Sequence, residues 1–342
     1  MGFFSVEFDH GGYIKGYENV IDFSSNVNPL PIPKRVERLL KKSIERMRYY
    51  PDPFCEELKE AVCRELNLPA DMVLFGNGST EIIYLITRVF KPKKVLIFEP
   101  TFSEYKKASL LEGASVSKLY LNSRFELETT SHEEVDMLFL CHPNNPTGNF
   151  VIERNEMIFD FKAGYYVVDE AFIDFVDEKE KYSFLSFLNG RERLIILRTF
   201  TKFFPLAGLR IGYVLSKSDT IERLKRFQPP WTVNAFAMIA LKAFLLEREF
   251  QEKTLKVLKS ERLYLARKLK ELGFEVYPSL TNFLLIRLKD GQSSTLVKEE
   301  LLKKGILVRD CSNFEGLGDR FIRVCVKTRS ENRKLIQALS SL

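Results

Sequence analysis

Short runs of branched and aromatic residues alternate with amphipathic or turn-rich segments along most of the chain. A continuous apolar run that ends in polar or turn residues is typical of a strand buried on both faces of a sheet. Strands that alternate with helices predict an α/β fold with a largely parallel sheet. The expected strands are the start of MVLFGNGSTEIIYLITRVF (72–90), KVLIFEP (94–100), VSKLYL (116–121), DMLFLC (136–141), YYVVDE (165–170), RLIILR (193–198) and IGYVL (211–215).

The pattern changes after QPPWTVNAF (228–236). A helical pattern then runs from about 234 to 272 with little interruption, and we expect it to link two lobes. The shorter elements that follow predict a compact α+β lobe. They are FEVYPS, FLLIRL (283–288), SSTLVKEELLKKG (293–305), ILVRD, FIRVCV (321–326) and a closing helix, SENRKLIQAL.

The beginning of the chain has a third pattern. HGGY (10–13) and IDFSSNVNPLPIP (21–33) are punctuated by glycine, proline and asparagine and show no helical periodicity. We therefore expect an N-terminal arm over residues 1–33 and a large domain over 34–235. A small C-terminal domain is expected over 236–342, together with part of the N-terminal segment.

Composition narrows the class of protein. With 342 residues, 45% hydrophobic and 29% charged, the chain suits a globular protein of two lobes. No run reaches the roughly 18 apolar residues of a membrane span, and the N-terminus lacks the features of a signal peptide. The five cysteines have no C-x-x-C spacing and the three histidines lie apart. We therefore expect a cytoplasmic protein with reduced thiols, no metal site and no membrane partner.

The charge pattern bears on possible partners. The net charge of +6 is spread along amphipathic helices such as KRVERLLKKSIERMR (34–48). Charges of this kind normally form a solvated face, and no patch of basic and aromatic residues accompanies them. Nucleic acid is therefore not an expected partner.

Candidate chemistry is concentrated in TFTKFFPLAGLRIG (199–212), which follows an expected strand. This stretch places two hydroxyls, one amine and one guanidinium close together, in Thr199, Thr201, Lys202 and Arg210. The set suits an aldehyde that carries a phosphate. The lysine can form a Schiff base while the hydroxyls and the arginine bind the phosphate. The alternative is an ordinary solvated loop lysine.

Two other strand ends carry candidate groups. YYVVDE ends in Asp169 and Glu170, at the edge where ligands bind in open α/β sheets, and Asp169 is the candidate. Its carboxylate suits a protonated pyridine nitrogen, and a helix cap or a buried ion pair is the alternative. The turn HPNNPTG (142–148) follows another expected strand, and an ordinary turn is its alternative.

A Gly-x-Gly turn at 76–78 leaves the amides of Ser79 and Thr80 at a helix N-terminus. The helix dipole and the unpaired N–H groups attract phosphate at such a position. The turn is not G-x-G-x-x-G, so a dinucleotide-binding fold is the weaker interpretation. Further along, Thr101 and Glu104 predict a capping box for the next helix.

Together, the asparagine-rich turn, the strand-end aspartate and the T-x-T-K and G-x-R sequences resemble the aspartate aminotransferase superfamily of fold type I enzymes. These enzymes use pyridoxal 5′-phosphate (PLP), and the order and spacing agree over nearly the whole chain. The resemblance implies that Lys202 forms the Schiff base, that Asp169 pairs with the ring nitrogen and that Asn145 bonds the ring hydroxyl. It also implies that the phosphate is held by Ser79, Thr80, Thr199, Thr201 and Arg210.

Three further positions follow from the resemblance. Tyr50 in YYPDP matches the tyrosine that reaches the neighbouring subunit's phosphate, so we expect a homodimer. Phe102 matches the aromatic residue that stacks on the cofactor, with a plain core aromatic as the alternative. Phe172 stands where many relatives have tyrosine, so a second hydrogen bond to the ring hydroxyl should be missing.

Two arginines of the C-terminal lobe, Arg309 and Arg323, lie on successive expected strands. Arginine suits bidentate binding of carboxylate or phosphate, and a surface salt bridge is the alternative for either one alone. The resemblance implies that Arg323 binds the α-carboxylate of the substrate and that Arg309 binds a second anion. His10 and Asn28 of the arm are possible helpers.

Several stretches look like the threonine-phosphate decarboxylases of the cobalamin pathway, and Phe172 fits that branch. Histidinol-phosphate aminotransferases share most of the cofactor residues, so amine transfer is the alternative. Both branches act on small phosphorylated amino compounds. A third hypothesis is a PLP-binding regulatory module fused to a DNA-binding domain, for which we expect residues 1–33 to be too short. The stretches are HGGY, DFSSNVNPL, YYPDP, DEAFIDF, PPWTVNA and RDCSNFEGLGDRFIRVCVKT (309–328).

Overall fold

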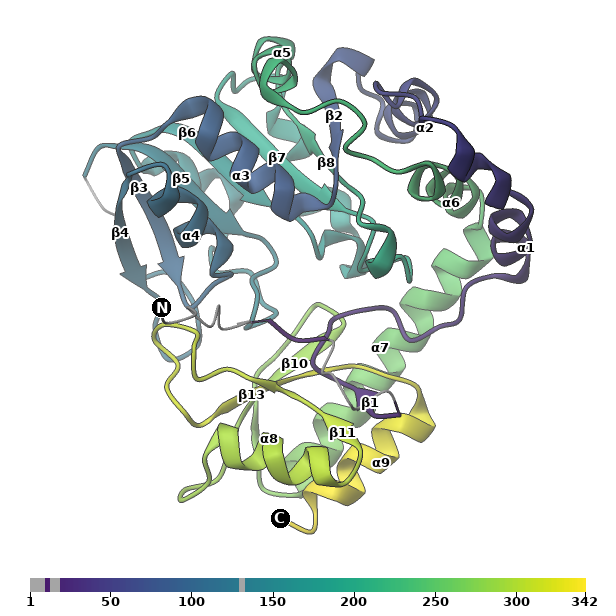
Figure 1. The fold of residues 1–342 in the computed structure, drawn as a ribbon. Coiled ribbons are helices and arrows are strands. Elements are labelled where there is room, and N and C mark those ends of the chain that lie inside the picture. Colours follow the sequence, from purple (N-terminus) through teal and green to yellow (C-terminus); the bar gives the residue numbers. More distant parts are fainter. Residues whose placement is uncertain (1–9, 13–18, 129–132) are drawn as a thin grey trace, which may run out of the picture.

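The computed structural model describes residues 10–12, 19–128 and 133–342 (Figure 1). The larger part is built on a seven-stranded sheet in the order β2-β8-β7-β6-β5-β3-β4. Strand β8 runs opposite to the other six strands of this sheet, which are parallel to one another, and this confirms the expected α/β fold with a mostly parallel sheet. The strands are β2 (Val73–Gly76), β3 (Lys94–Glu99), β4 (Ser115–Tyr120), β5 (Val135–Cys141), β6 (Ala163–Asp169), β7 (Leu194–Thr199) and β8 (Gly212–Leu215).

The two faces of this sheet belong to different hydrophobic cores. On β5, Leu138 and Leu140 pack in one core, and Met137 and Phe139 pack in the other. Successive side chains of a strand point to opposite faces, which explains the alternation. Both faces are covered, so the strands are nearly continuous apolar runs, and the sequence pattern identified them for that reason.

The second part of the chain forms a four-stranded antiparallel sheet in the order β12-β13-β10-β9. The N-terminal segment also belongs here, because β1 pairs in parallel with β11. Helices α7, α8 and α9 lie around this sheet (Figure 1). The strands are β1 (Ile21–Asp22), β9 (Glu275–Val276), β10 (Phe283–Arg287), β11 (Ile306–Leu307), β12 (Arg309–Asp310) and β13 (Phe321–Cys325).

Two expected helices are interrupted. The stretch expected at 234–272 is two helices, α6 (Ala235–Leu245) and α7 (Arg248–Glu271), because the backbone of Glu247 leaves the helical region. The helix expected at 34–48 is α1 (Lys34–Lys42) followed by the 3₁₀ helix η1 (Ile44–Arg48).

The remaining α-helices are α2 (Glu56–Leu66), α3 (Ser79–Phe90), α4 (Glu104–Leu111), α5 (Ser218–Phe227), α8 (Ser294–Lys303) and α9 (Arg329–Leu339). Short 3₁₀ helices occupy several connections, namely η2 (Ala70–Met72), η3 (Asn155–Asp160), η4 (Ile173–Phe175), η5 (Lys179–Lys181), η6 (Phe184–Phe187) and η7 (Ala207–Leu209). None of the helices in the described ranges is long and apolar enough to cross a membrane.

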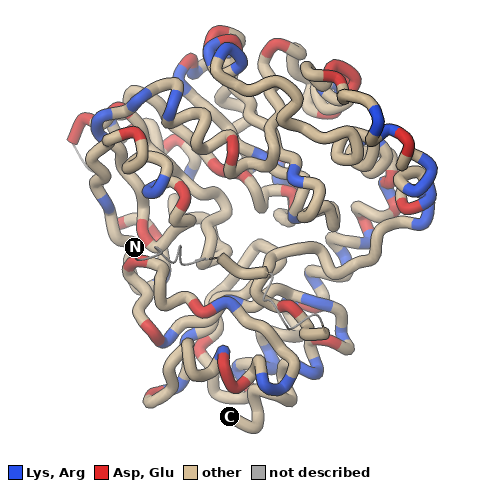
Figure 2. Tube along the Cα trace, in the orientation of Figure 1, with Lys and Arg blue, Asp and Glu red and all other residues tan. Residues whose placement is uncertain are grey.

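The N-terminal segment passes between the two sheets on its way to α1 (Figure 1). The Asn28 N–H donates to the Lys202 carbonyl at 3.1 Å, and the Cys325 N–H donates to the Phe23 carbonyl at 2.8 Å. These bonds tie the segment to the larger part and to the smaller part. Lys and Arg positions are interspersed with Asp and Glu positions along the trace in Figure 2.

Gly212 at the start of β8 gives a test of how tightly the sheet and α3 pack. A Cβ atom there would lie 2.5 Å from the Ser79 nitrogen and 2.9 Å from the Gly78 carbonyl carbon. We expect Gly212→Ala to lower the free energy of unfolding in urea by about 1–3 kcal/mol, the usual cost of overpacking. Gly190→Ala is the matched control, because nothing lies within 4 Å of its added Cβ. Equal stability of the two variants would contradict the close approach.

Candidate active site

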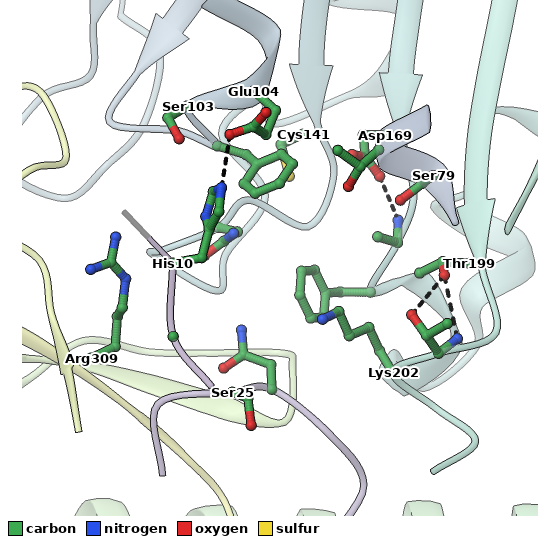
Figure 3. A pocket seen from close by; sticks show the side chains of 18 of the residues that line it. His10, Ser25, Ser79, Ser103, Glu104, Cys141, Asp169, Thr199, Lys202 and Arg309 are labelled. Atoms are coloured by element: carbon green, nitrogen blue, oxygen red, sulfur yellow. Dashed lines mark hydrogen bonds and ion pairs between the residues drawn. The ribbon is translucent and has the colours of Figure 1, made fainter. Parts of the chain in front are cut away.

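A cavity of about 520 Å³ lies where the carboxyl ends of β5, β6 and β7 face the N-terminal segment and β12–β13. Figure 3 shows His10, Asp169, Lys202 and Arg309 pointing toward it from these different elements. Most of the residues singled out in the sequence line the cavity. They are His10, Ser79, Thr80, Phe102, Asn145, Asp169, Thr199, Thr201, Lys202, Arg210, Arg309 and Arg323.

Asp169 is the last residue of β6 and is only 3% exposed. The Tyr105 hydroxyl donates to its Oδ2 atom at 2.7 Å, and the Ala171 N–H donates to its Oδ1 atom at 2.9 Å. Burial disfavours the charged form and raises the pKa of Asp169 to about 6, although both hydrogen bonds act in the opposite direction. The carboxylate is therefore held in place in surroundings that favour a proton on or near it.

Lys202 follows β7 and reaches into the same cavity (Figure 3). Desolvation lowers the pKa of its amine to about 8, and the positive charges of Arg323 and Arg210 act in the same direction. An amine with this pKa is neutral, and so nucleophilic, in a larger fraction of molecules near neutral pH than an ordinary lysine.

A second group of residues surrounds the start of α3. Gly78 has φ +83°, and a Cβ there would lie 2.5 Å from Arg210 Nη2, so the guanidinium is packed against the turn. Thr199 Oγ1 and Thr201 Oγ1 are 2.9 Å apart. A helix N-terminus, two hydroxyls and a guanidinium thus meet at one side of the cavity, and each of them favours an anion.

A third group is centred on Arg323, which is 6% exposed. Its Nη2 donates to the Ser24 carbonyl at 2.9 Å, and its Nη1 donates to Asn145 Oδ1. Arg323 Nε and Asn26 Oδ1 have no hydrogen-bond partner among the described residues, although both atoms are buried. A buried donor and a buried acceptor without partners are costly unless a ligand satisfies them.

At the outer side of the cavity, His10 Nε2 lies 2.7 Å from Glu104 Oε1, and its ring centroid is 5.5 Å from that of Phe102. The Tyr84 hydroxyl donates to the other carboxylate oxygen of Glu104 at 2.6 Å. The capping box expected from Thr101 and Glu104 is therefore wrong. Helix α4 begins at Glu104, whose carboxylate makes long-range contacts in place of a cap.

Asn28 and Tyr50 do not line the cavity within this chain. The Asn28 side chain is buried and donates to the Phe203 carbonyl at 2.7 Å and to Thr254 Oγ1 at 3.0 Å. The expectation that it helps to bind the substrate is therefore not supported, because its amide is used to anchor the segment beside Lys202. Tyr50 is 82% exposed and packs on Trp231, with 4.8 Å between ring centroids.

Sequence reasoning missed three residues of this site: Asn26, Tyr105, and Glu104 as the hydrogen-bond partner of His10. Asn26 lies in the same DFSSNVNPL stretch as Asn28. The stretch therefore indicated that an asparagine of the arm reaches the cavity, but Asn26 lines it and Asn28 does not. Nothing in the local sequence indicates the contacts of Glu104 and Tyr105, whose partners are far away in the chain. Among the described residues no group of His, Cys, Asp and Glu could hold a metal ion.

A buried aspartate, a lysine of lowered pKa and a helix N-terminus that favours an anion lie together at the carboxyl edge of a mostly parallel sheet, as expected of fold type I PLP-dependent enzymes. Comparison with known families agrees. The family "Aminotransferase class I and II", whose members depend on PLP, matches residues 18–339, and the chain belongs to it.

Relatives within this family carry two kinds of name. A protein of Caldanaerobacter subterraneus subsp. tengcongensis, named provisionally as a threonine-phosphate decarboxylase, is 39% identical over 347 residues, which cover 98% of this chain and 94% of that protein. A histidinol-phosphate aminotransferase of Methanococcus aeolicus is 33% identical over 339 residues, covering 95% of this chain and 90% of that protein.

A solved structure agrees in fold. The L-threonine-O-3-phosphate decarboxylase of Porphyromonas gingivalis superposes with a TM-score of 0.84 at 28% identity. The superposition covers 93% of this chain and 98% of that chain. The fold expected from the resemblance is thus confirmed over nearly the whole length of both proteins.

The raised pKa of Asp169 leads to a test on cofactor-free protein. Its ordinary pKa of 3.8 rises to about 6 in the folded state, so the folded protein holds this proton more tightly than the unfolded chain. The carboxylate therefore lowers stability increasingly as the pH rises through this interval. We expect the free energy of unfolding of Asp169→Asn, relative to wild type, to increase by about 2–3 kcal/mol between about pH 4 and pH 7 in urea titrations.

The matched control for that titration is Asp290→Asn, because the Asp290 side chain is 96% exposed. Its titration separates the loss of a surface carboxylate from the loss of the buried one. A difference between Asp169→Asn and wild type that does not change with pH would contradict the account.

Proposed function

We propose that this chain is a threonine-phosphate decarboxylase, a PLP-dependent enzyme that acts on a small phosphorylated amino compound. The observation that carries the proposal is the distribution of charge in the cavity. His10, Arg309 and Arg323 line it together with Lys202 and Asp169. A substrate with a carboxylate and a phosphate offers one anion to each guanidinium. The names of the two sequence relatives support a phosphorylated amino substrate.

The residues present fit PLP. Arg210 is packed against the glycine turn that begins α3, and this places its guanidinium beside the helix N-terminus as a cradle for a phosphate. In our proposal the cofactor phosphate is held by Ser79, Thr80, Thr199, Thr201 and Arg210. Preformed donors of this kind bind an anion without the cost of ordering a loop.

On the ring, Asp169 would pair with the nitrogen and Phe102 would lie against one face. Asn145 Oδ1 already accepts from Arg323, so its Nδ2 is the atom that can donate to the ring hydroxyl. Phe172 is buried and packs edge-on against Phe283, with 5.0 Å between ring centroids. Its ring can donate no hydrogen bond to the cofactor.

When bound, PLP withdraws electrons from the bond that is broken at the α carbon of the substrate. The chain's own groups prepare this. Lys202 Nζ, with its lowered pKa, is the amine that would attach to the aldehyde and could hold or return a proton beside the α carbon. Tyr105 and the Ala171 N–H hold the carboxylate of Asp169, which would keep a proton at the ring nitrogen.

At the substrate end, we propose that Arg323 binds the α-carboxylate and Arg309 the phosphate, with His10 as a helper. The buried Nε of Arg323 supports this, because this donor has no partner among the described residues and can bind a carboxylate oxygen. The buried Oδ1 of Asn26 is an acceptor, so it suits an N–H or O–H donor of the substrate. In our proposal Asn26, rather than Asn28, is the asparagine of the arm that helps to bind the substrate. The alternative reaction is transfer of the amine from histidinol phosphate to 2-oxoglutarate, which the Methanococcus relative's name favours.

We further propose a homodimer. A group of large apolar side chains is exposed near Tyr50, namely Met47, Tyr49, Phe54 and Trp231. Such a patch is typical of a surface that is covered by a partner. Since Tyr50 does not line the cavity of its own chain, it is available to a partner's cavity.

The proposal also includes the domain boundaries, the cellular compartment and the pathway. The lobes divide near residue 235, with residues 1–33 as an arm, 34–235 as the large domain and 236–342 as the small one. Five free, buried cysteines favour the cytoplasm. The decarboxylase branch implies a role in cobalamin biosynthesis.

The substrate is tested by supplying threonine phosphate and histidinol phosphate to the holoenzyme, each with and without 2-oxoglutarate, and following CO₂ and glutamate. We expect CO₂ from threonine phosphate without any acceptor, and no CO₂ with Lys202→Ala. Threonine itself should react with a kcat/KM lower by about 100-fold or more, because buried cationic groups would lack their anion. Glutamate from histidinol phosphate, without CO₂ from threonine phosphate, would replace the decarboxylase by the aminotransferase. Indifference to the phosphate would overturn both.

The dimer is tested with Tyr50→Phe. If the hydroxyl binds the partner's phosphate, the Kd for PLP should rise by about tenfold, because a hydrogen bond to a charged group contributes roughly 1.5 kcal/mol. Tyr49→Phe, at a neighbouring exposed tyrosine, is the control and should leave the Kd unchanged. A stable, active monomer in light scattering would contradict the proposal.

A further inference from the structure

The connection between β12 and β13, residues 311–320, forms part of the rim of the cavity. We call it the rim loop. Asn313 and Phe314 of this loop line the cavity. The next residue, Glu315, reaches β4 and α4 of the larger part, where its carboxylate accepts hydrogen bonds.

Three donors converge on the Glu315 carboxylate. Its Oε1 atom accepts from Lys118 Nζ at 2.5 Å and from the Tyr120 hydroxyl at 2.7 Å, and its Oε2 atom accepts from Lys106 Nζ at 3.0 Å. Lys118 and Tyr120 belong to β4, and Lys106 belongs to α4. A single exposed ion pair contributes little, but three donors on two rigid elements fix the position of one carboxylate.

Apolar contacts dock the same loop. Gly316 has φ +89°, and a Cβ there would lie 3.2 Å from Cδ1 of Tyr120, so the backbone passes close to that ring. Phe314 and Leu317 share a small hydrophobic core with Phe125, which belongs to the larger part of the chain. The rim loop therefore joins the two parts by polar and apolar contacts at once.

The loop is also joined to Arg309. The Arg309 Nη2 atom donates to Asn313 Oδ1 at 2.8 Å, and its guanidinium carbon lies 5.2 Å from the ring centroid of Phe314. A displacement of the rim loop would thus displace the groups that position this guanidinium. Arg309 is the residue to which we assign the phosphate of the substrate.

We propose that Glu315 is a positioning residue: its contacts with Lys106, Lys118 and Tyr120 latch the rim loop onto β4 and α4 and thereby hold Arg309 in place for the phosphorylated end of the substrate. The link to the substrate rests on the proposed function, whereas the latch itself does not. Glu315 touches neither the cofactor residues nor Lys202, so its loss should change substrate binding and leave the cofactor in place.

The latch is tested by hydrogen–deuterium exchange on the holoenzyme. Glu315→Gln removes the charge but keeps an oxygen acceptor, so the chain should still fold. We expect faster exchange of amides 311–318 in this variant and unchanged exchange in α8. Glu300→Gln is the matched control, since Glu300 pairs with Lys303 within α8. Unchanged exchange in the rim loop of Glu315→Gln would overturn the proposal.

The effect on the substrate is tested by steady-state kinetics with the phosphate ester that the wild-type enzyme converts. We expect KM to rise about fivefold to tenfold in Glu315→Gln, with kcat and the Kd for PLP within about twofold of wild type, as for loss of a partly exposed ionic network. Tyr120→Phe should raise KM in the same direction by less. The Glu300→Gln control should match wild type.

The outcomes separate the latch from the substrate assignment. Faster exchange with an unchanged KM would overturn the link to Arg309. A loss of PLP affinity or of thermal stability that parallels the change in KM would show a merely structural role and would also overturn it. If the wild-type enzyme converts neither phosphate ester, the proposed function fails, and the exchange experiment still decides whether Glu315 holds the loop.

Discussion

The parallel pairing of β5, β6 and β7 is the constraint on which the site depends. In this register Cys141 lies opposite Asp169, and Asp169 lies opposite Leu197, so three strands end at one edge. The turns that follow these ends carry Asn145 and Lys202, while Asp169 itself ends β6. A shift of one residue in the register would turn Asp169 toward the other face and separate these groups. The hydrophobic cores on both faces prevent such a shift.

Desolvation then gives these groups their chemical properties. Burial raises the pKa of Asp169 and lowers the pKa of Lys202 and of Arg323. In each case the surrounding protein disfavours the charged form of the side chain. A bound partner of opposite charge would favour that form. The same burial that costs stability therefore favours the binding of a cofactor and a substrate that carry several anionic groups.

The sequence predicted the parts of the molecule whose signals are local. Strands buried on both faces were found within a few residues, and so were the turns at their ends, because apolar runs and Gly/Asn/Pro turns are short-range patterns. Contacts between distant elements were missed. Tyr105 meets Asp169 across 64 positions, and Lys106 meets Glu315 across 209.

Two smaller errors have the same cause, namely contacts with distant residues. Asn26 and Asn28 lie two positions apart in an irregular segment, and the tertiary contacts of Asn28 with Phe203 and Thr254 decide which one reaches the cavity. The capping box failed because the carboxylate of Glu104 contacts His10 and Tyr84 in place of the backbone.

The pairing of β12 with β13 bears on which reaction the site suits. Arg309 and Arg323 are direct partners across these antiparallel strands. Side chains at such positions lie on the same face a few ångströms apart, and like charges opposite each other are destabilising. Threonine phosphate has a carboxylate and a phosphate, so one molecule can satisfy both guanidinium groups. Histidinol phosphate has a phosphate but no carboxylate. With this substrate, Arg323 would have no carboxylate to bind until the amine acceptor entered the site. The fixed spacing of the two arginines therefore favours a substrate that carries both anions on one short carbon chain.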